Sequence, residues 1–159
     1  MRIGTGYDIH RLVGGRAFVL GGVTLDYPRG PHGYSDGDAL AHAVIDALLG
    51  AAALGDIGRH FPPGDPQWLN ASSIDLLRRT CDLLAEAGFV VHNVDSTVIL
   101  EEPRLGPYVE RMRAALADAM QVSVERVSVK AKSNEGLDAV GSKEAVAVHA
   151  VALLEEVSS

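Results

Sequence analysis

Two side chains of metal-ligand type stand two residues apart near the N-terminus, in the stretch RIGTGYDIH (residues 2–10). In an extended chain, side chains two residues apart point to the same side, so Asp8 and His10 converge. Gly4 and Gly6 share this side, and glycine in a strand often marks the close approach of a ligand or of another backbone segment. The stretch predicts a strand with room for a metal or a phosphate. The same pair can also end a strand and hydrogen-bond to a turn. A third ligand elsewhere in the chain would favour the metal site over this alternative.

His42 is the candidate third ligand. The segment DALAHAVIDALLGAAA (residues 38–53) has the apolar period of a helix. Opposite its apolar stripe, Asp38, His42 and Asp46 follow one another at i, i+4, i+8 spacing. Such a polar stripe is usually a solvated helix face, and this interpretation stays open for the two aspartates. The histidine supplies the further nitrogen that the strand lacks, and two histidines with one carboxylate leave an open position, as catalytic zinc sites do.

Composition narrows the class of protein. The chain has 159 residues, of which 47% are hydrophobic and 22% are charged, and this predicts a single globular domain over residues 1–159 without a membrane span. The net charge of −7 argues against general nucleic-acid binding, which needs a basic face. Cys81 is the only cysteine, so any metal must use His, Asp or Glu. The N-terminal stretch lacks the features of a signal peptide, and we expect a cytoplasmic protein.

Apolar periods and turn residues predict the elements around these ligands. Expected strands are residues 2–10, 16–20, 23–27, 89–100 and 126–132. Expected helices are residues 38–53, a segment capped by Ser72 or Ser73 that ends at Gly88, and residues 107–120. We expect loops at residues 28–37, 54–70, 101–106 and 133–144, and a strand or a helix at residues 145–157. This mixture predicts an α+β fold, with helices packed on one face of a mixed β-sheet.

The sequence resembles the 2-C-methyl-D-erythritol 2,4-cyclodiphosphate synthases of the non-mevalonate isoprenoid pathway. The segments that carry the likeness are GYDIHR, GGV, SDGDALAHAVIDALLGAAALGDIGRHFP and VKAKSNEGL, and the likeness runs from about residue 2 to residue 154. The resemblance implies a homotrimer with a Bacillus chorismate mutase-like fold and active sites at subunit interfaces. It also implies a phosphorus–oxygen lyase that converts 4-diphosphocytidyl-2-C-methyl-D-erythritol 2-phosphate to 2-C-methyl-D-erythritol 2,4-cyclodiphosphate and releases CMP.

Carried over position by position, the resemblance also implies the site residues. Zinc or another divalent transition metal binds Asp8, His10 and His42, while Mg²⁺ or Mn²⁺ binds Glu135 together with the diphosphate. Tyr34 and Ser133 occupy catalytic positions, and Asp8 and His10 also contact the substrate. Around the methylerythritol phosphate and the ribose lie Tyr34, Ser35, Asp56, Ile57, Gly58, Phe61 and Asp65. Around the cytidine and its diphosphate lie Leu100, Arg104, Leu105, Gly106, Lys132, Ser133, Asn134 and Glu135.

This sequence departs from the common family pattern at several positions. Tyr34 stands where a histidine is usual, and Pro63 replaces an acid. The segment DAVGSKE (residues 138–144) replaces one in which an aromatic residue and an arginine line a cavity on the three-fold axis, where an isoprenoid diphosphate can lodge. Ala139 and Ser142 hold those two positions here. Alanine offers little apolar contact and serine no cation, so we predict that this chain does not bind such a ligand there.

Two other functions fit the same residues. A metal-dependent phosphohydrolase would use the three ligands with water as the nucleophile, and it would release two linear phosphates where a cyclase keeps one ring. A non-catalytic trimer that binds a metal or a ligand is the other, although the acids of the SDGD and GDIG loops exceed what a bracing metal needs. The sequence favours the cyclase, with a small cytidine diphosphate substrate and neither nucleic acid nor membrane as a partner.

Overall fold

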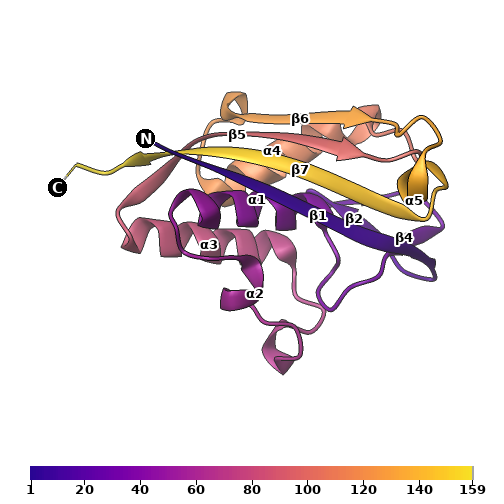
Figure 1. The fold of residues 1–159 in the computed structure, drawn as a ribbon, viewed down its shortest axis with the longest axis horizontal. Helices are drawn as coiled ribbons and strands as arrows, with labels where there is room; N and C mark the ends of the chain where they lie inside the picture. The colour runs from indigo at the N-terminus through magenta and orange to yellow at the C-terminus, as the bar shows by residue number, and fades with distance from the viewer. Residues whose placement is uncertain (159) are drawn as a thin grey trace.

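The computed structural model describes residues 1–158, and its centre is a five-stranded mixed sheet (Figure 1). The strand order is β4-β1-β7-β5-β6. The strands are β1 Arg2–Gly14, β4 Arg29–Pro31, β5 Phe89–Ile99, β6 Val127–Lys132 and β7 Ala145–Glu156. β5 and β6 run parallel, and the other neighbouring pairs run antiparallel. A separate hairpin joins β2 Phe18–Leu20 to β3 Val23–Leu25. The predicted mixed sheet with helices is confirmed.

Three long helices, α1 Ala39–Ala51, α3 Ser73–Glu86 and α4 Val109–Met120, cover one face of this sheet. α1 lies against β1 and β7, α4 lies against β6, and α3 packs on both helices. The shorter helical segments are α2 Ile57–His60, α5 Asp138–Gly141, η1 Pro66–Trp68, η2 Gly106–Tyr108 and η3 Val124–Arg126. Within residues 1–158, no helix combines the length and the apolar character that a membrane crossing requires.

Two glycines of β1 let α1 approach the sheet closely. A Cβ atom on Gly6 would lie 1.9 Å from the carbonyl oxygen of Ala43, and a Cβ atom on Gly4 would lie 2.1 Å from that of Ala47. No side chain can occupy either position, so the contact between strand and helix requires both glycines. The sequence predicted a close approach at these residues, and what approaches is the backbone of α1 rather than a metal or a phosphate.

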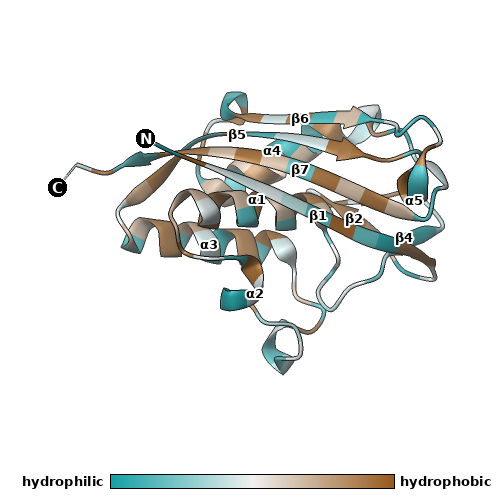
Figure 2. Cartoon of the chain, in the orientation of Figure 1, coloured by the Kyte–Doolittle hydropathy of each residue, from teal (hydrophilic) through white to brown (hydrophobic). Residues whose placement is uncertain are grey.

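The opposite face of β1 and β7 exposes apolar side chains in this single chain. Along β1, the side chains of Ile3, Tyr7 and Ile9 are 70%, 50% and 45% exposed. On the neighbouring strand, Val151 pairs with Thr5 and is 41% exposed. Figure 2 shows how much of β7 is hydrophobic along its length. An exposed apolar patch of this kind typically marks an interaction surface.

The structure differs from the predicted elements mainly in the connecting segments. Residues 54–70, expected to be a loop, contain α2 and η1. They form because the side chains of Asp56 and Asp65 each accept a backbone N–H from inside the turn that follows. The segment 133–144, also expected to be a loop, contains α5.

Two boundaries also differ from those expected, and the structure decides the type of one element that the sequence left open. β1 continues to Gly14 because its end pairs with β4, within the segment expected to be a loop. α4 begins at Val109, since Pro107 lies in η2 before it. The C-terminal segment, whose period fits a strand or a helix, is β7, and it pairs along both edges with β1 and β5. Backbone pairing with two neighbours decides its conformation.

Candidate metal centre and active site

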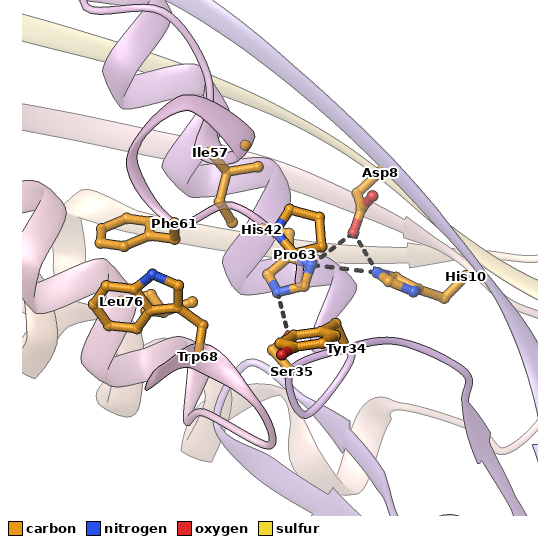
Figure 3. Close-up of a pocket in the computed structure, with 11 residues that line it drawn as sticks. Asp8, His10, Tyr34, Ser35, His42, Ile57, Phe61, Pro63, Trp68 and Leu76 are labelled. Atoms are coloured by element: carbon orange, nitrogen blue, oxygen red, sulfur yellow. Dashed lines mark hydrogen bonds and ion pairs between the residues drawn. The ribbon is translucent and has the colours of Figure 1, made fainter. Parts of the chain in front are cut away.

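Asp8, His10 and His42 converge on one point, with one ligand atom from each within 4.8 Å of the others (Figure 3). Oδ2 of Asp8 lies 2.8 Å from Nε2 of His10 and 3.0 Å from Nδ1 of His42. The two imidazole nitrogens lie 3.3 Å apart. Tetrahedral donors about 2.0–2.1 Å from a zinc ion lie about 3.3 Å from one another. The donor set and its spacing therefore fit a divalent metal ion with an open coordination position.

The contact between β1 and α1 sets this geometry. Asp8 and His10 share a face of β1 because they are two residues apart, and pairing with Val148 and Val146 of β7 fixes their register. His42 comes from α1, next to Ala43, whose carbonyl oxygen rests over Gly6. The close contact between Gly6 and α1 thus keeps His42 near enough to Asp8 and His10 for all three to bind one metal ion.

The electrostatics of the group favour a bound cation. Burial disfavours the charged form of Asp8, but hydrogen bonds with His10 and His42 outweigh it and lower the pKa of Asp8 to about 2. Burial also acts to lower the pKa of His10, but its hydrogen bond and ion pair with Asp8 raise that pKa above the ordinary value. An ionised carboxylate faces two imidazoles, and a metal ion can take the place of the protons between them.

Two aspartates of α1 and its N-cap are not part of a solvated face, which corrects that interpretation of the helix. Asp38 is fully buried, and its carboxylate accepts the backbone N–H groups of Gly21, Gly22 and Ala41, so it ties the β2–β3 hairpin to the start of α1. Burial raises the pKa of Asp38. Asp46 is partly buried, and its carboxylate accepts the N–H of Ile57 at 2.8 Å. Both aspartates organise the backbone around the metal ligands.

A cavity of about 220 Å³ opens beside the three ligands. Five of the residues predicted to bind substrate line it together with the metal ligands, namely Tyr34, Ser35, Ile57, Gly58 and Phe61. Trp68 and Leu76 add an apolar wall that sequence reasoning missed. A single tryptophan in a loop rich in proline was the available signal for this wall.

Three of the predicted residues at this cavity have local structural partners. The hydroxyl of Tyr34 donates to the carbonyl oxygen of Asp65 at 3.1 Å, and Pro63 lines the cavity. The carboxylates of Asp56 and Asp65 cap α2 and η1 and are not part of the cavity lining. The structure therefore brings five of the predicted substrate-binding residues to the cavity and leaves these two acids out of its lining.

A second cavity, of about 610 Å³, contains most of the residues predicted to bind the cytidine diphosphate. Those that line it are Leu100, Arg104, Leu105, Gly106, Lys132 and Ser133. Asn134 and Glu135 follow in the chain, where the exposed Glu135 donates its backbone N–H to Oγ of Ser133. The two cavities share no lining residue. Within one chain, the predicted site is therefore divided into two separate halves.

The segment predicted to lack an isoprenoid site lies near this second half. Ala139 belongs to α5, and the hydroxyl of Ser142 donates to the carbonyl oxygen of Asp138 at 3.0 Å. Nζ of Lys143 pairs with Oε1 of Glu102 at 3.0 Å. The cation next to position 142 is therefore engaged by a carboxylate of its own chain.

Known proteins resemble this chain along almost its whole length. The chain is 55% identical over 156 residues to the 2-C-methyl-D-erythritol 2,4-cyclodiphosphate synthase of Gloeobacter violaceus, covering 98% of this chain and 96% of that protein. It is 54% identical over 154 residues to the protein of the same name from Symbiobacterium thermophilum, covering 97% and 98%. These likenesses extend over almost the whole of all three chains.

Solved structures share the fold. A CDP-bound 2C-methyl-D-erythritol-2,4-cyclodiphosphate synthase matches with a TM-score of 0.89 and 38% identity, covering 97% of this chain and 100% of that chain. The bifunctional IspDF from Campylobacter jejuni matches with a TM-score of 0.94 and 37% identity, covering 98% of this chain and 42% of that chain. Residues 1–155 match the model of the YgbB family. The chain therefore belongs to the YgbB family.

Proposed function

We propose that this chain is a 2-C-methyl-D-erythritol 2,4-cyclodiphosphate synthase of the non-mevalonate isoprenoid pathway. The substrate is 4-diphosphocytidyl-2-C-methyl-D-erythritol 2-phosphate, and the products are the cyclic diphosphate and CMP. The convergence of Asp8, His10 and His42 beside a cavity carries the proposal, in a chain more than half identical to proteins of that name.

The reaction needs positioning more than acid–base chemistry. An oxygen of the 2-phosphate attacks the β-phosphorus of the same molecule, and the bond from that phosphorus to the oxygen of CMP breaks. The nucleophile is already an anion, so no general base is required. The barrier lies in bringing two anionic phosphates together in line, and a site lowers it by holding both and by balancing their charge.

We propose zinc or another divalent transition metal at Asp8, His10 and His42, and Mg²⁺ or Mn²⁺ with Glu135 and the diphosphate. When bound, the metals supply Lewis-acid polarisation and positive charge to the phosphates. Ser133 accepts the N–H of Glu135, so its own hydroxyl hydrogen is free to donate to a phosphate oxygen. Tyr34 offers its ring to the cavity, because its hydroxyl hydrogen is already donated to Asp65.

We also propose that the active protein is a homotrimer with a Bacillus chorismate mutase-like fold, in which each active site combines residues of two chains. The division of the predicted residues between two unconnected cavities supports this assembly, since a neighbouring chain can bring the two halves together. The exposed apolar face of β1 and β7 provides a surface for the contact. The single domain over residues 1–159 and the cytoplasmic location stay predictions from the sequence.

Product analysis tests the proposed reaction. Purified protein loaded with Zn²⁺ and Mg²⁺ is expected to convert the substrate to equimolar CMP and one cyclic diphosphate. In ³¹P NMR, the cyclic diphosphate gives two coupled resonances, and CMP gives the only phosphomonoester signal. A phosphohydrolase would instead give two linear phosphates. A non-catalytic protein would bind CDP without consuming the substrate. Either of these outcomes overturns the proposal.

A further inference from the structure

A partly buried chain of hydrogen bonds runs from Nε2 of His42 to a carboxylate outside the metal group. Nε2 of His42 lies 2.8 Å from Oγ of Ser73, the first residue of α3. The Ser73 hydroxyl lies in turn against Oδ1 of Asp36. Ser73 is completely buried, at 0% exposure. Asp36, Ser73 and His42 thus form a continuous relay behind the metal group.

The direction of these hydrogen bonds follows from what each group can donate. The Asp36 carboxylate only accepts, so Ser73 gives it the single hydroxyl hydrogen. The Ser73 oxygen therefore accepts from its other neighbour, which places the proton on Nε2 of His42. Oγ of Ser35 lies at a longer distance, 3.2 Å, from the same Nε2 atom. A neutral imidazole with its proton on Nε2 carries its lone pair on Nδ1. Nδ1 is the atom that faces Asp8.

The other histidine ligand is held in the same way from the opposite side. Nδ1 of His10 lies 2.8 Å from the backbone carbonyl oxygen of His32, which can only accept. This leaves Nε2 of His10 toward the common point, where it meets Asp8. In both rings, the nitrogen away from the metal group has a fixed partner.

Backbone contacts hold the Asp36 end of the relay in place. Oδ2 of Asp36 accepts the backbone N–H of Ser73 at 3.0 Å, and Oδ1 accepts that of Asp38 at 3.1 Å. The carboxylate is therefore fixed to the starts of both α3 and α1, since Asp38 is the N-cap of α1. Through the relay, the starts of α1 and α3 hold the imidazole of His42 in one orientation.

We infer that Asp36 and Ser73 are positioning residues that hold His42 as the tautomer and in the orientation that a metal ion requires. Asp36 is not one of the converging ligands, and Ser73 contacts His42 at Nε2, whereas Nδ1 faces Asp8. This inference deepens the proposed function and rests on the proposed metal site. Removal of such a partner behind a metal-ligating histidine typically weakens metal binding by about 10–100-fold.

The test compares two neighbouring serines of α3. Ser73→Ala removes the relay, whereas Ser72→Ala removes the N-cap, whose side chain accepts the N–H of Asp75 and has no contact with His42. Zinc affinity is measured by competition with a chelator at one fixed pH. We expect Ser73→Ala to bind zinc about 10–100-fold more weakly than the wild type and Ser72→Ala to bind it unchanged. Thermal melts of both variants show how much each loses in stability.

Two further measurements separate positioning from a general loss of structure. In zinc-loaded protein, we expect the Nε2 proton of His42 to give a slowly exchanging NMR signal. This signal should exchange faster and shift upfield in Ser73→Ala but not in Ser72→Ala. Asp36→Ala should weaken zinc binding as well. The double variant Asp36→Ala/Ser73→Ala should lose no more zinc affinity than the single variant that binds zinc more weakly. The reason is that both residues act on His42 through one relay.

Each outcome decides between the possible explanations. The inference is overturned if Ser73→Ala binds zinc within twofold of Ser72→Ala, or if the imidazole proton signal is the same in both. Full additivity of the Asp36 and Ser73 losses would also overturn it. Wild-type protein that binds no divalent transition metal would overturn the proposed metal site itself, and the relay with it.

Discussion

His42 lies on α1, whereas the other two ligands of the metal group lie on β1. Replacing His42 therefore leaves only the two strand ligands for the metal ion. In His42→Ala, we expect zinc affinity and cyclase activity to fall by more than about 100-fold, because losing a ligand exceeds the 10–100-fold loss for an outer partner. The fold should persist, since the side chain borders a cavity. Metal content after dialysis and CMP release measure the two effects.

His92→Ala is the matched control for this prediction. Its imidazole pairs with Glu155, away from the metal group. The variant should retain its zinc and its activity. Full zinc occupancy and full activity in His42→Ala would show that the proposed ligand set is wrong.

For single residues, the sequence predicts the position of a side chain when the local backbone conformation decides where that side chain points. Alternation along β1 and the period of α1 point Asp8, His10 and His42 before any packing is known. Ser73 is different, because it meets His42 only when α3 packs against α1. Asp38 likewise looked like a surface acid, since its partners belong to the β2–β3 hairpin. Interactions between distant segments are invisible to periodicity.

Among the elements, the packing of β1 on α1 is the most sensitive to substitution. Gly6→Ala would place its Cβ 1.9 Å from a backbone oxygen of α1, which no side-chain rotation can relieve. We expect a loss of about 3 kcal/mol or more of stability, because overpacked sites usually lose about 1–3 kcal/mol and here the obstacle is main chain. Zinc affinity should fall too, since the helix that carries His42 must move. Urea unfolding and chelator competition measure both.

Gly14→Ala provides the control within the same strand. No atom lies within 4 Å of a Cβ built on Gly14, so we expect stability to change by less than about 1 kcal/mol. Equal stability of the two variants would mean that α1 does not rest on Gly6 as described.

The elements that the sequence predicted well are those with long apolar periods. α1, α3 and the β2–β3 hairpin lie within a few residues of their expected bounds. α2, η1 and α5 escaped prediction because single turns have no period, and in the first two only an aspartate cap marks the start. β7 could not be assigned from its own residues, since its two neighbouring strands decide its conformation.

For the whole molecule, shared active sites predict complementation between inactive variants. His42→Ala keeps the half around Glu135, and Glu135→Ala keeps the three metal ligands. In trimers that contain both variants, one of the three interfaces should combine two intact halves and regain activity. The measurement is CMP release from co-refolded, differently tagged chains isolated by both tags.

The control for complementation mixes differently tagged copies of the same variant, where no interface is intact. Activity should then stay at background. Verified mixed trimers without recovery would count against active sites shared between chains.

The axis of the proposed trimer gives a second prediction for the assembly. Ala139 and Ser142 provide neither an aromatic ring nor a cation, and Lys143 is paired with Glu102. We expect calorimetry to detect no binding of farnesyl diphosphate to zinc-loaded protein, while CDP binds under the same conditions. Micromolar binding of one molecule per trimer, lost when the axial cavity is blocked, would contradict this.

The pairing of β1 with β7 also orders events during synthesis on the ribosome. Arg2 pairs with Leu154, so β1 waits for β7, which is translated after the intervening segments. Asp8 and His10 leave the ribosome long before β7, the strand that fixes their register. Pairing across such a sequence separation is slow and leaves apolar strands open to aggregation meanwhile. The nascent chain must therefore keep its metal ligands unassembled until β7 has left the ribosome.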